Sequence, residues 1–198
     1  MIKSLALWAV AGVLVGLPLD LLHVASGVLR YTPATSWMPF GLQAWWAVPL
    51  FAGAGAALGL GHRHGATRIA AATGAPSMPV ATGMAALAGV VALVFAYASS
   101  NALAPWPVTA LMAYVAVWLF VVARVHPDAR RALVLHSLGT AVVGPVVEAL
   151  LVSQGMFEYA HPDVAGVAFW LPGIYLNAGA AAHLLDRHQR AREMRIGA

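Results

Sequence analysis

The stretch Ala132–Gln154, ALVLHSLGTAVVGPVVEALLVSQ, decides the fold of this chain. It is an unbroken apolar run whose only ionisable side chains are His136 and Glu148. An α-helix needs about 20 such residues to cross a bilayer. Strands of a membrane β-barrel would instead read as shorter, alternating segments. We therefore expect a membrane-spanning helix here.

Comparable apolar runs lie on both sides of this one. The predicted spans are 4–25, 43–61, 80–98, 106–123, 132–154 and 167–186. The composition agrees, because 61% of the residues are hydrophobic and only 9% are charged, whereas a soluble domain carries about 25% charged residues. The sequence predicts an all-α polytopic membrane protein, with residues 1–198 forming a single six-helix transmembrane domain.

The first run has a second interpretation. It could be a signal peptide, with Lys3 as its basic end. We favour a retained helix, because the run is long for a signal peptide and carries Asp20 and His23 in its second half.

Basic residues mark one side of the predicted bundle. Ten of the 11 Lys and Arg residues lie at the N-terminus, in the 61–79 and 124–131 loops and in the C-terminal tail, and the opposite loops carry only Arg30. The positive-inside rule then places both termini in the cytoplasm, which requires an even number of spans. The charges sit between apolar runs rather than on one face, which argues against nucleic acid as a partner. The Ala-, Gly-, Val- and Arg-rich composition is typical of a high-GC bacterial genome, so we expect a bacterial inner (plasma) membrane.

A weak repeat links two loops on the opposite side. Gly27-Val28-Leu29-Arg30-Tyr31 matches Gly155-Met156-Phe157-Glu158-Tyr159, and a Pro and then a Trp and Pro follow each copy. If the repeat is real, the first two and last two helices are parallel repeats about an axis along the membrane normal. Arg30 and Glu158 would then be oppositely charged equivalents that could pair.

Small residues dominate the first two predicted helices. Gly12 and Gly16 form one GxxxG motif, and Gly55 and Gly59 form another. Such faces let helix backbones approach closely. We favour packing inside one subunit, although a homo-oligomer contact through these faces is the alternative.

Few ionisable residues lie within the predicted spans: Asp20, His23, His136, Glu148 and His183. Such residues are costly in hydrocarbon and usually face the protein interior or a cavity. Asp20 and His23 share a helix face and could pair. Glu148, one turn after Gly144-Pro145, could donate to a lipid ester or hydroxyl when protonated, or form a structural interhelical hydrogen bond. We place His183 beside Asp186 near the cytoplasmic interface.

Motifs for catalysis are missing from the sequence. It has no HExxH, GxSxG or Walker motif and no cysteine. His62-x-His64 resembles a metal motif, but it lies beside Arg63 with no carboxylate near it, so we expect no metal there. We accordingly predict no enzyme and no cofactor.

Several segments resemble the Insig family of membrane proteins. They are AWWAVP (44–49), YAS (97–99), GMFEYAHPD (155–163) and WLP (170–172). The resemblance implies a six-helix sensor of the endoplasmic reticulum membrane that binds oxysterols and retains partners with sterol-sensing domains. The family's acidic residue after the segment matching 97–99 is absent here, as are its cysteines. We therefore carry over the fold and a lipid cavity, but neither the sterol nor the protein partner.

The sequence thus favours a membrane lipid-binding or sensor protein. The ligand would be a glycerolipid similar to diacylglycerol, or a sterol-like molecule, held in a cavity between bent helices. The candidate ligand-binding residues are His23, Trp46, Trp118, His136, Thr140 and Glu148. The alternatives are a transporter or flippase, an intramembrane lipid enzyme with His136 and Glu148 as base and acid, and a scaffold for another protein's transmembrane helices.

Overall fold

The structure, a computed structural model, describes residues 2–39, 41–73 and 83–196. These residues form the helices α1 (Ile2–Ala25), α2 (Ala47–Thr73), α3 (Gly83–Leu103), α4 (Pro107–Arg124), α5 (Pro127–Ser153) and α6 (Leu171–Ile196) and the short strands β1 (Leu29–Tyr31) and β2 (Phe157–Tyr159). The predicted all-α fold with six helices is confirmed. The start of the third predicted span, 80–82, lies outside the described residues, and so do the side chains of Lys3, Arg68 and Arg195.

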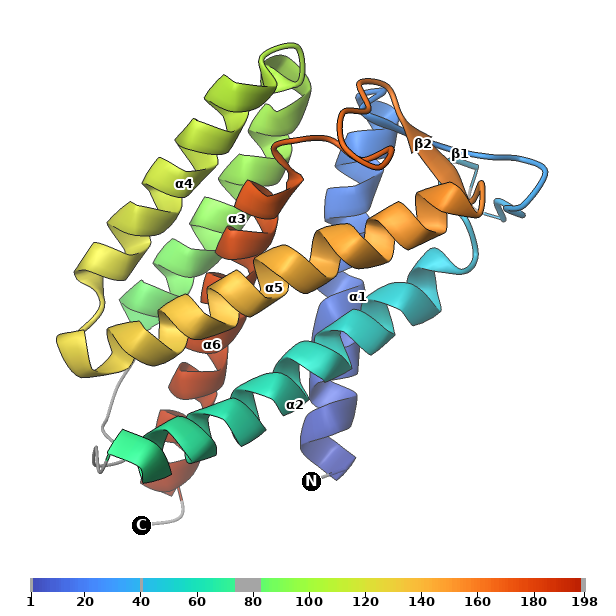
Figure 1. Cartoon of the computed structure of the whole chain (residues 1–198). Coiled ribbons are helices and arrows are strands. Elements are labelled where there is room, and N and C mark those ends of the chain that lie inside the picture. The colour runs from blue at the N-terminus through green and yellow to red at the C-terminus, as the bar shows by residue number, and fades with distance from the viewer. Residues whose placement is uncertain (1, 40, 74–82, 197–198) are drawn as a thin grey trace.

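Helix α6 lies at the centre of the bundle, where it contacts α2, α3, α4 and α5 (Figure 1). The other five helices form a ring around it in the order α1, α3, α4, α5, α2, each contacting the next. Both chain ends lie at one end of the bundle, and the β1–β2 ribbon lies at the other. The ribbon end and the terminal end thus differ in structure as well as in charge.

Four helices are long and apolar enough to cross a membrane, judged over the described residues alone. The apolar segments are Ser4–Ala25, Gly83–Leu103, Pro107–Arg124 and Ala129–Ser153. Helices α2 and α6 both continue past their apolar stretches into the polar residues that follow. A row of exposed apolar side chains on α5, including Val142, Val146 and Leu150, suits a bilayer as the surrounding solvent.

Helices α1 and α2 pack through their glycines. A Cβ atom on Gly12 would collide with the backbone of Phe51 and Gly55, and one on Gly55 would collide with the backbone of Trp8 and Gly12. Gly16 lies against the Phe51 ring in the same way, and Gly59 against Trp8. The two GxxxG motifs therefore serve packing within the subunit, as we favoured from the sequence.

The two copies of the sequence repeat pair with each other. Strands β1 and β2 are antiparallel, with Arg30 opposite Glu158. The Arg30 guanidinium lies 3.9 Å from the Glu158 carboxylate, so the predicted charge pair is confirmed. Antiparallel pairing of two equivalent strands creates a local twofold axis between them.

Backbone hydrogen bonds obey the same symmetry. The Thr32 amide donates to Met156, and the equivalent Ala160 amide donates to Val28. Gly27 and Gly155 occupy equivalent left-handed turns, with φ of 76° and 69°, where each helix ends and its strand begins. Helix α1 packs on α2 and α5 packs on α6. The repeat inferred from sequence therefore corresponds to a structural repeat, α1–β1–α2 and α5–β2–α6.

Candidate functional site

Glu148 on α5 is the centre of one half of a polar cluster beneath the ribbon. The Tyr175 hydroxyl on α6 donates to its Oε1 at 2.6 Å, and the Tyr159 hydroxyl on β2 donates to its Oε2. Burial, followed by the neighbouring carboxyl group of Glu148, raises the pKa of Tyr159 well above its ordinary value. Tyr159 therefore keeps its proton and acts as the donor.

Asp20 on α1 is the centre of the equivalent half. The hydroxyl of Tyr31 on β1 and the amide of Gln43 each donate to Asp20 Oδ2 at 2.8 Å. Tyr31 follows Asp20 by 11 residues, and Tyr159 follows Glu148 by the same interval. Each repeat thus contributes a carboxyl group in the helix and a tyrosine in the strand that satisfies it. Burial and then the Asp20 carboxyl group raise the pKa of Tyr31 above its ordinary value, so it too remains a donor.

Aromatic rings join the two halves. The His23 ring stacks on Tyr97 of α3 at 4.6 Å between centroids, and it meets the edge of Trp170 at 5.8 Å. The indole of Trp46 donates to the Ser36 hydroxyl at 3.0 Å and stacks on Phe157. Asp20 and Glu148 are close enough to act on each other electrostatically. We call this set the ribbon-side cluster: Asp20, His23, Tyr31, Gln43, Trp46, Tyr97, Glu148, Tyr159, Trp170 and Tyr175.

The ribbon-side cluster lies between helices whose backbones stay apart. Within the described residues, no Cα atom of α1 comes within 8 Å of one in α5 or α6. The cluster's large side chains bridge this gap from both repeats. Asp20 is 7% exposed and His23 is 4% exposed, whereas Glu148 is only partly buried. Of the two carboxyl-bearing residues of the cluster, Glu148 is therefore the less buried, and Tyr159 and Tyr175 enclose its carboxyl group.

The six candidate residues from the sequence fall in different places. His23, Trp46 and Glu148 belong to the ribbon-side cluster. Trp118 belongs to a second apolar core around Leu133. His136 lies further towards the terminal end of α5, and the Thr140 hydroxyl donates to the His136 carbonyl at 2.8 Å.

Sequence reasoning missed the four tyrosines and Gln43. Tyr31 and Tyr159 are both only 5% exposed and hydrogen bonded to carboxyl groups. A signal was available, because the repeat extends upstream from Gly27 and Gly155 to Asp20 and Glu148 at the same interval. Gln43 and Tyr175 have no polar counterpart at the equivalent position of the other repeat, so only the structure places them in the cluster.

Fold and site together define an integral membrane protein of the polytopic α-helical class, with polar groups gathered beneath a ribbon at one end of its bundle. No family model matches the sequence. The INSIG protein homolog of Mycolicibacterium vanbaalenii is 37% identical over 122 residues, which span 59% of this chain and 57% of that protein. The alignment thus covers little more than half the length of that relative.

Two crystal structures extend the likeness along nearly the whole chain. MvINS, the Insig homolog from Mycobacterium vanbaalenii, superposes with a TM-score of 0.78 at 25% identity, covering 97% of this chain and 96% of that one. A cross-linked trimer of an MvINS variant gives a TM-score of 0.79 with the same coverage. The chain is a homologue of this bacterial Insig protein and has the Insig fold, as the sequence resemblance predicted.

Proposed function

We propose that this Insig homologue binds a membrane lipid with a small uncharged polar head, such as diacylglycerol or a sterol-like molecule. The observation that carries the proposal is Glu148, a partly buried acidic residue between the apolar side chains in the second half of α5. Polar groups at that depth are costly, so they are usually kept for a ligand or a pathway. The sequence supports a binding role, because it carries none of the catalytic motifs HExxH, GxSxG or Walker.

The surroundings of Glu148 suit both parts of such a lipid. Val146, Val147 and Leu150 on the same helix are exposed and would face acyl chains or rings. Tyr175 and Tyr159 hold the carboxyl group in place. The head group would then share Glu148 with these hydroxyls, and His23 and Trp46 would form the wall behind it. Trp118, His136 and Thr140 lie outside this arrangement and would contact at most the distal part of the ligand.

Native mass spectrometry with lipid extraction tests the proposal on the detergent-purified protein. We expect one lipid per chain to survive washing, and its mass distinguishes a glycerolipid from a sterol. Replacing one hydrogen-bonding partner of the head should weaken retention by about 2- to 10-fold. Glu148→Gln, which keeps an acceptor for the tyrosines, is the primary variant. Glu158→Gln, an exposed glutamate in the ribbon, is the matched control.

Two results would defeat this proposal. One is wild-type protein that retains no lipid and gains no thermal stability when lipids are added back. The other is equal retention in Glu148→Gln and wild type. Lipid or ion flux in proteoliposomes that Glu148→Gln abolishes would favour a transporter instead. Capture of another protein's transmembrane helix without any lipid would favour a scaffold.

We propose that the chain forms a homo-oligomer, since the homologous MvINS crystallised as a cross-linked trimer. The GxxxG glycines of α1 and α2 are already used inside the subunit, so the contact would use other faces. The same native mass spectra measure the number of chains. A monomer at every protein concentration would refute this proposal.

We also propose that both termini face the cytoplasm of a bacterial inner membrane, because the basic residues gather at the terminal end. The chain has no cysteine, so single cysteines report topology directly. Ala34 near the ribbon and Arg192 near the C-terminus are both exposed. An impermeant maleimide added to whole cells should label Ala34→Cys and spare Arg192→Cys until the membrane is opened. The reverse pattern would invert the topology.

A further inference from the structure

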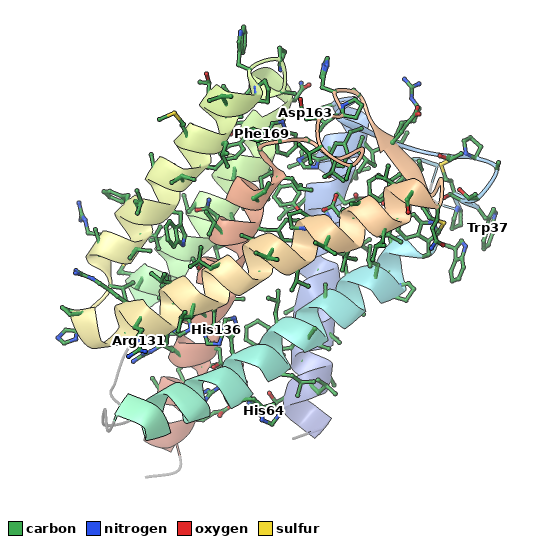
Figure 2. All side chains as sticks on the ribbon, viewed as in Figure 1. Trp37, His64, Arg131, His136, Asp163 and Phe169 are labelled. Atoms are coloured by element: carbon green, nitrogen blue, oxygen red, sulfur yellow. The ribbon has the colours of Figure 1, made fainter. Side chains whose placement is uncertain are left out.

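Three histidines from three helices converge at the terminal end of the bundle. They are His62 on α2, His136 on α5 and His183 on α6, which we call the histidine cluster. Ring centroids are 4.2 Å apart for His62 and His136, 5.4 Å for His62 and His183, and 5.2 Å for His136 and His183. Figure 2 places His136 between the ribbons of α5 and α2. His64, the other half of the sequence motif, is exposed and belongs to no such group.

The geometry points to a site for a divalent transition-metal ion, and we propose that this cluster binds Zn²⁺. One nitrogen from each ring lies within 4.8 Å of the other two. A point within about 2.8 Å of all three therefore exists, because the enclosing circle has a radius of at most 4.8/√3 Å. Zinc–histidine bonds are about 2.0–2.1 Å long, so each ring needs to move inward by less than about 1 Å.

The hydrogen bonding of the rings agrees with a ligand role. Both ring nitrogens of His62 and Nε2 of His183 are buried without a hydrogen-bond partner among the described residues. His62 is 1% exposed and His183 is 2% exposed. Burying such polar atoms without a partner costs free energy. A metal ion would satisfy them.

His136 shows the second hydrogen bond that metal-bound histidines usually make. Its Nδ1 lies 2.8 Å from the Ala132 carbonyl, which only a protonated nitrogen can engage as a donor. A neutral ring carries one proton, so the shorter contact at Nδ1 leaves Nε2 as the nitrogen available to a metal ion. Nε2 lies 3.3 Å from the Gly61 carbonyl, a contact that the metal bond would replace. Such outer contacts fix the tautomer and orient the ring. Gly65 leaves room for this ring, since a Cβ atom there would lie 2.6 Å from His136 Nε2.

Charges of both signs lie near the histidine cluster. Arg187 and Arg190 act electrostatically on His183, and Asp186 offsets part of the charge of both arginines. Asp186 lies one turn after His183, is 2% exposed, and has one carboxylate oxygen without a hydrogen-bond partner among the described residues. Its other oxygen lies 2.6 Å from Arg190, which offsets that arginine's charge. Three neutral imidazoles suit Zn²⁺ and leave one coordination position open. A bound ion would tie α2, α5 and α6 together where the ribbon does not reach.

The test is zinc content and affinity in the full-length protein, purified without a histidine tag and stripped with a chelator. After reloading and desalting, we expect one zinc per chain by elemental mass spectrometry and a rise in melting temperature. His62→Gln and His183→Gln should each weaken zinc binding by at least about tenfold. Gly65→Ala, which crowds His136, should weaken it as well. His161→Gln, an exposed histidine in the loop before α6, is the matched control and should bind as wild type.

If a variant fails to fold, cobalt substitution in the wild-type protein tests whether the histidine cluster binds a metal ion. Co²⁺ bound to three histidines should give the intense visible absorption of a four-coordinate site in the wild type, and zinc should displace it stoichiometrically. Wild-type protein that binds no zinc, or that gives only the weak spectrum of six-coordinate Co²⁺, would overturn the proposal. Zinc retained equally by His62→Gln and His183→Gln would do the same.

Discussion

Gly55→Leu should abolish the native packing of α1 against α2. A Cβ atom at Gly55 already meets the carbonyl oxygen of Trp8 and the backbone of Gly12, so the obstacle is backbone that no rotamer change can move. Overpacking of a tight interface typically costs about 1–3 kcal/mol, and more where two helices must separate. We expect little or no monodisperse protein on size-exclusion chromatography. The milder Gly55→Ala should fold with a lowered melting temperature.

Gly53→Leu provides the matched control. Gly53 lies on the same helix, and a Cβ atom there meets nothing within 4 Å. Leucine is a better helix former than glycine by about 1 kcal/mol, so this variant should be as stable as wild type or slightly more so. If Gly53→Leu and Gly55→Leu unfolded at the same temperature, close backbone approach would not be what the glycines provide.

Most of the fold could be predicted from the sequence, because short stretches of sequence determine where the helices lie and how they pack. Apolar run length identifies a helix in a bilayer whatever surrounds it, and Gly12 and Gly55 lie in motifs whose spacing alone indicates close packing. The Arg30–Glu158 pair followed from the repeat, because equivalent positions near a twofold axis must meet. The end of α2 could not be predicted from the apolar run 43–61, since the helix continues to Thr73, well past the apolar residues that define a span.

The candidate site was only half predictable, for a different physical reason. Polarity and depth identified Asp20, His23 and Glu148, because charge is conspicuous in an apolar run. Their partners were not conspicuous, since tyrosine near a membrane interface is common without any special role. His62, His136 and His183 lie on three separate helices. The sequence drew attention to each of them separately, and only the packing of α2 and α5 around α6 brings them together.

Trp170→Ala should produce the largest loss of stability in the ribbon half of the molecule. The Trp170 side chain is 1% exposed and lies where the two repeats and α4 meet. Its ring contacts Tyr114 at 6.3 Å and Tyr159 at 6.1 Å between centroids, in edge-to-face geometry, and His23 at 5.8 Å. Truncating a buried tryptophan costs about 3–5 kcal/mol, because it removes apolar contacts and leaves a cavity. The melting temperature in detergent should fall accordingly, and lipid retention should fall with it.

Trp106→Ala isolates the effect of burial from that of residue type. Trp106, like Trp170, stands immediately before a helix with a proline in its first turn, but Trp106 is 61% exposed. Exposed positions usually change stability by no more than about 0.5 kcal/mol, so this variant should melt close to wild type. Trp170→Phe should recover much of the loss, because the Trp170 indole nitrogen has no hydrogen-bond partner among the described residues and phenylalanine refills most of the volume. If Trp170→Phe were as unstable as Trp170→Ala, a polar contact of the indole would be what matters, and the aromatic junction between the repeats would not depend on packing.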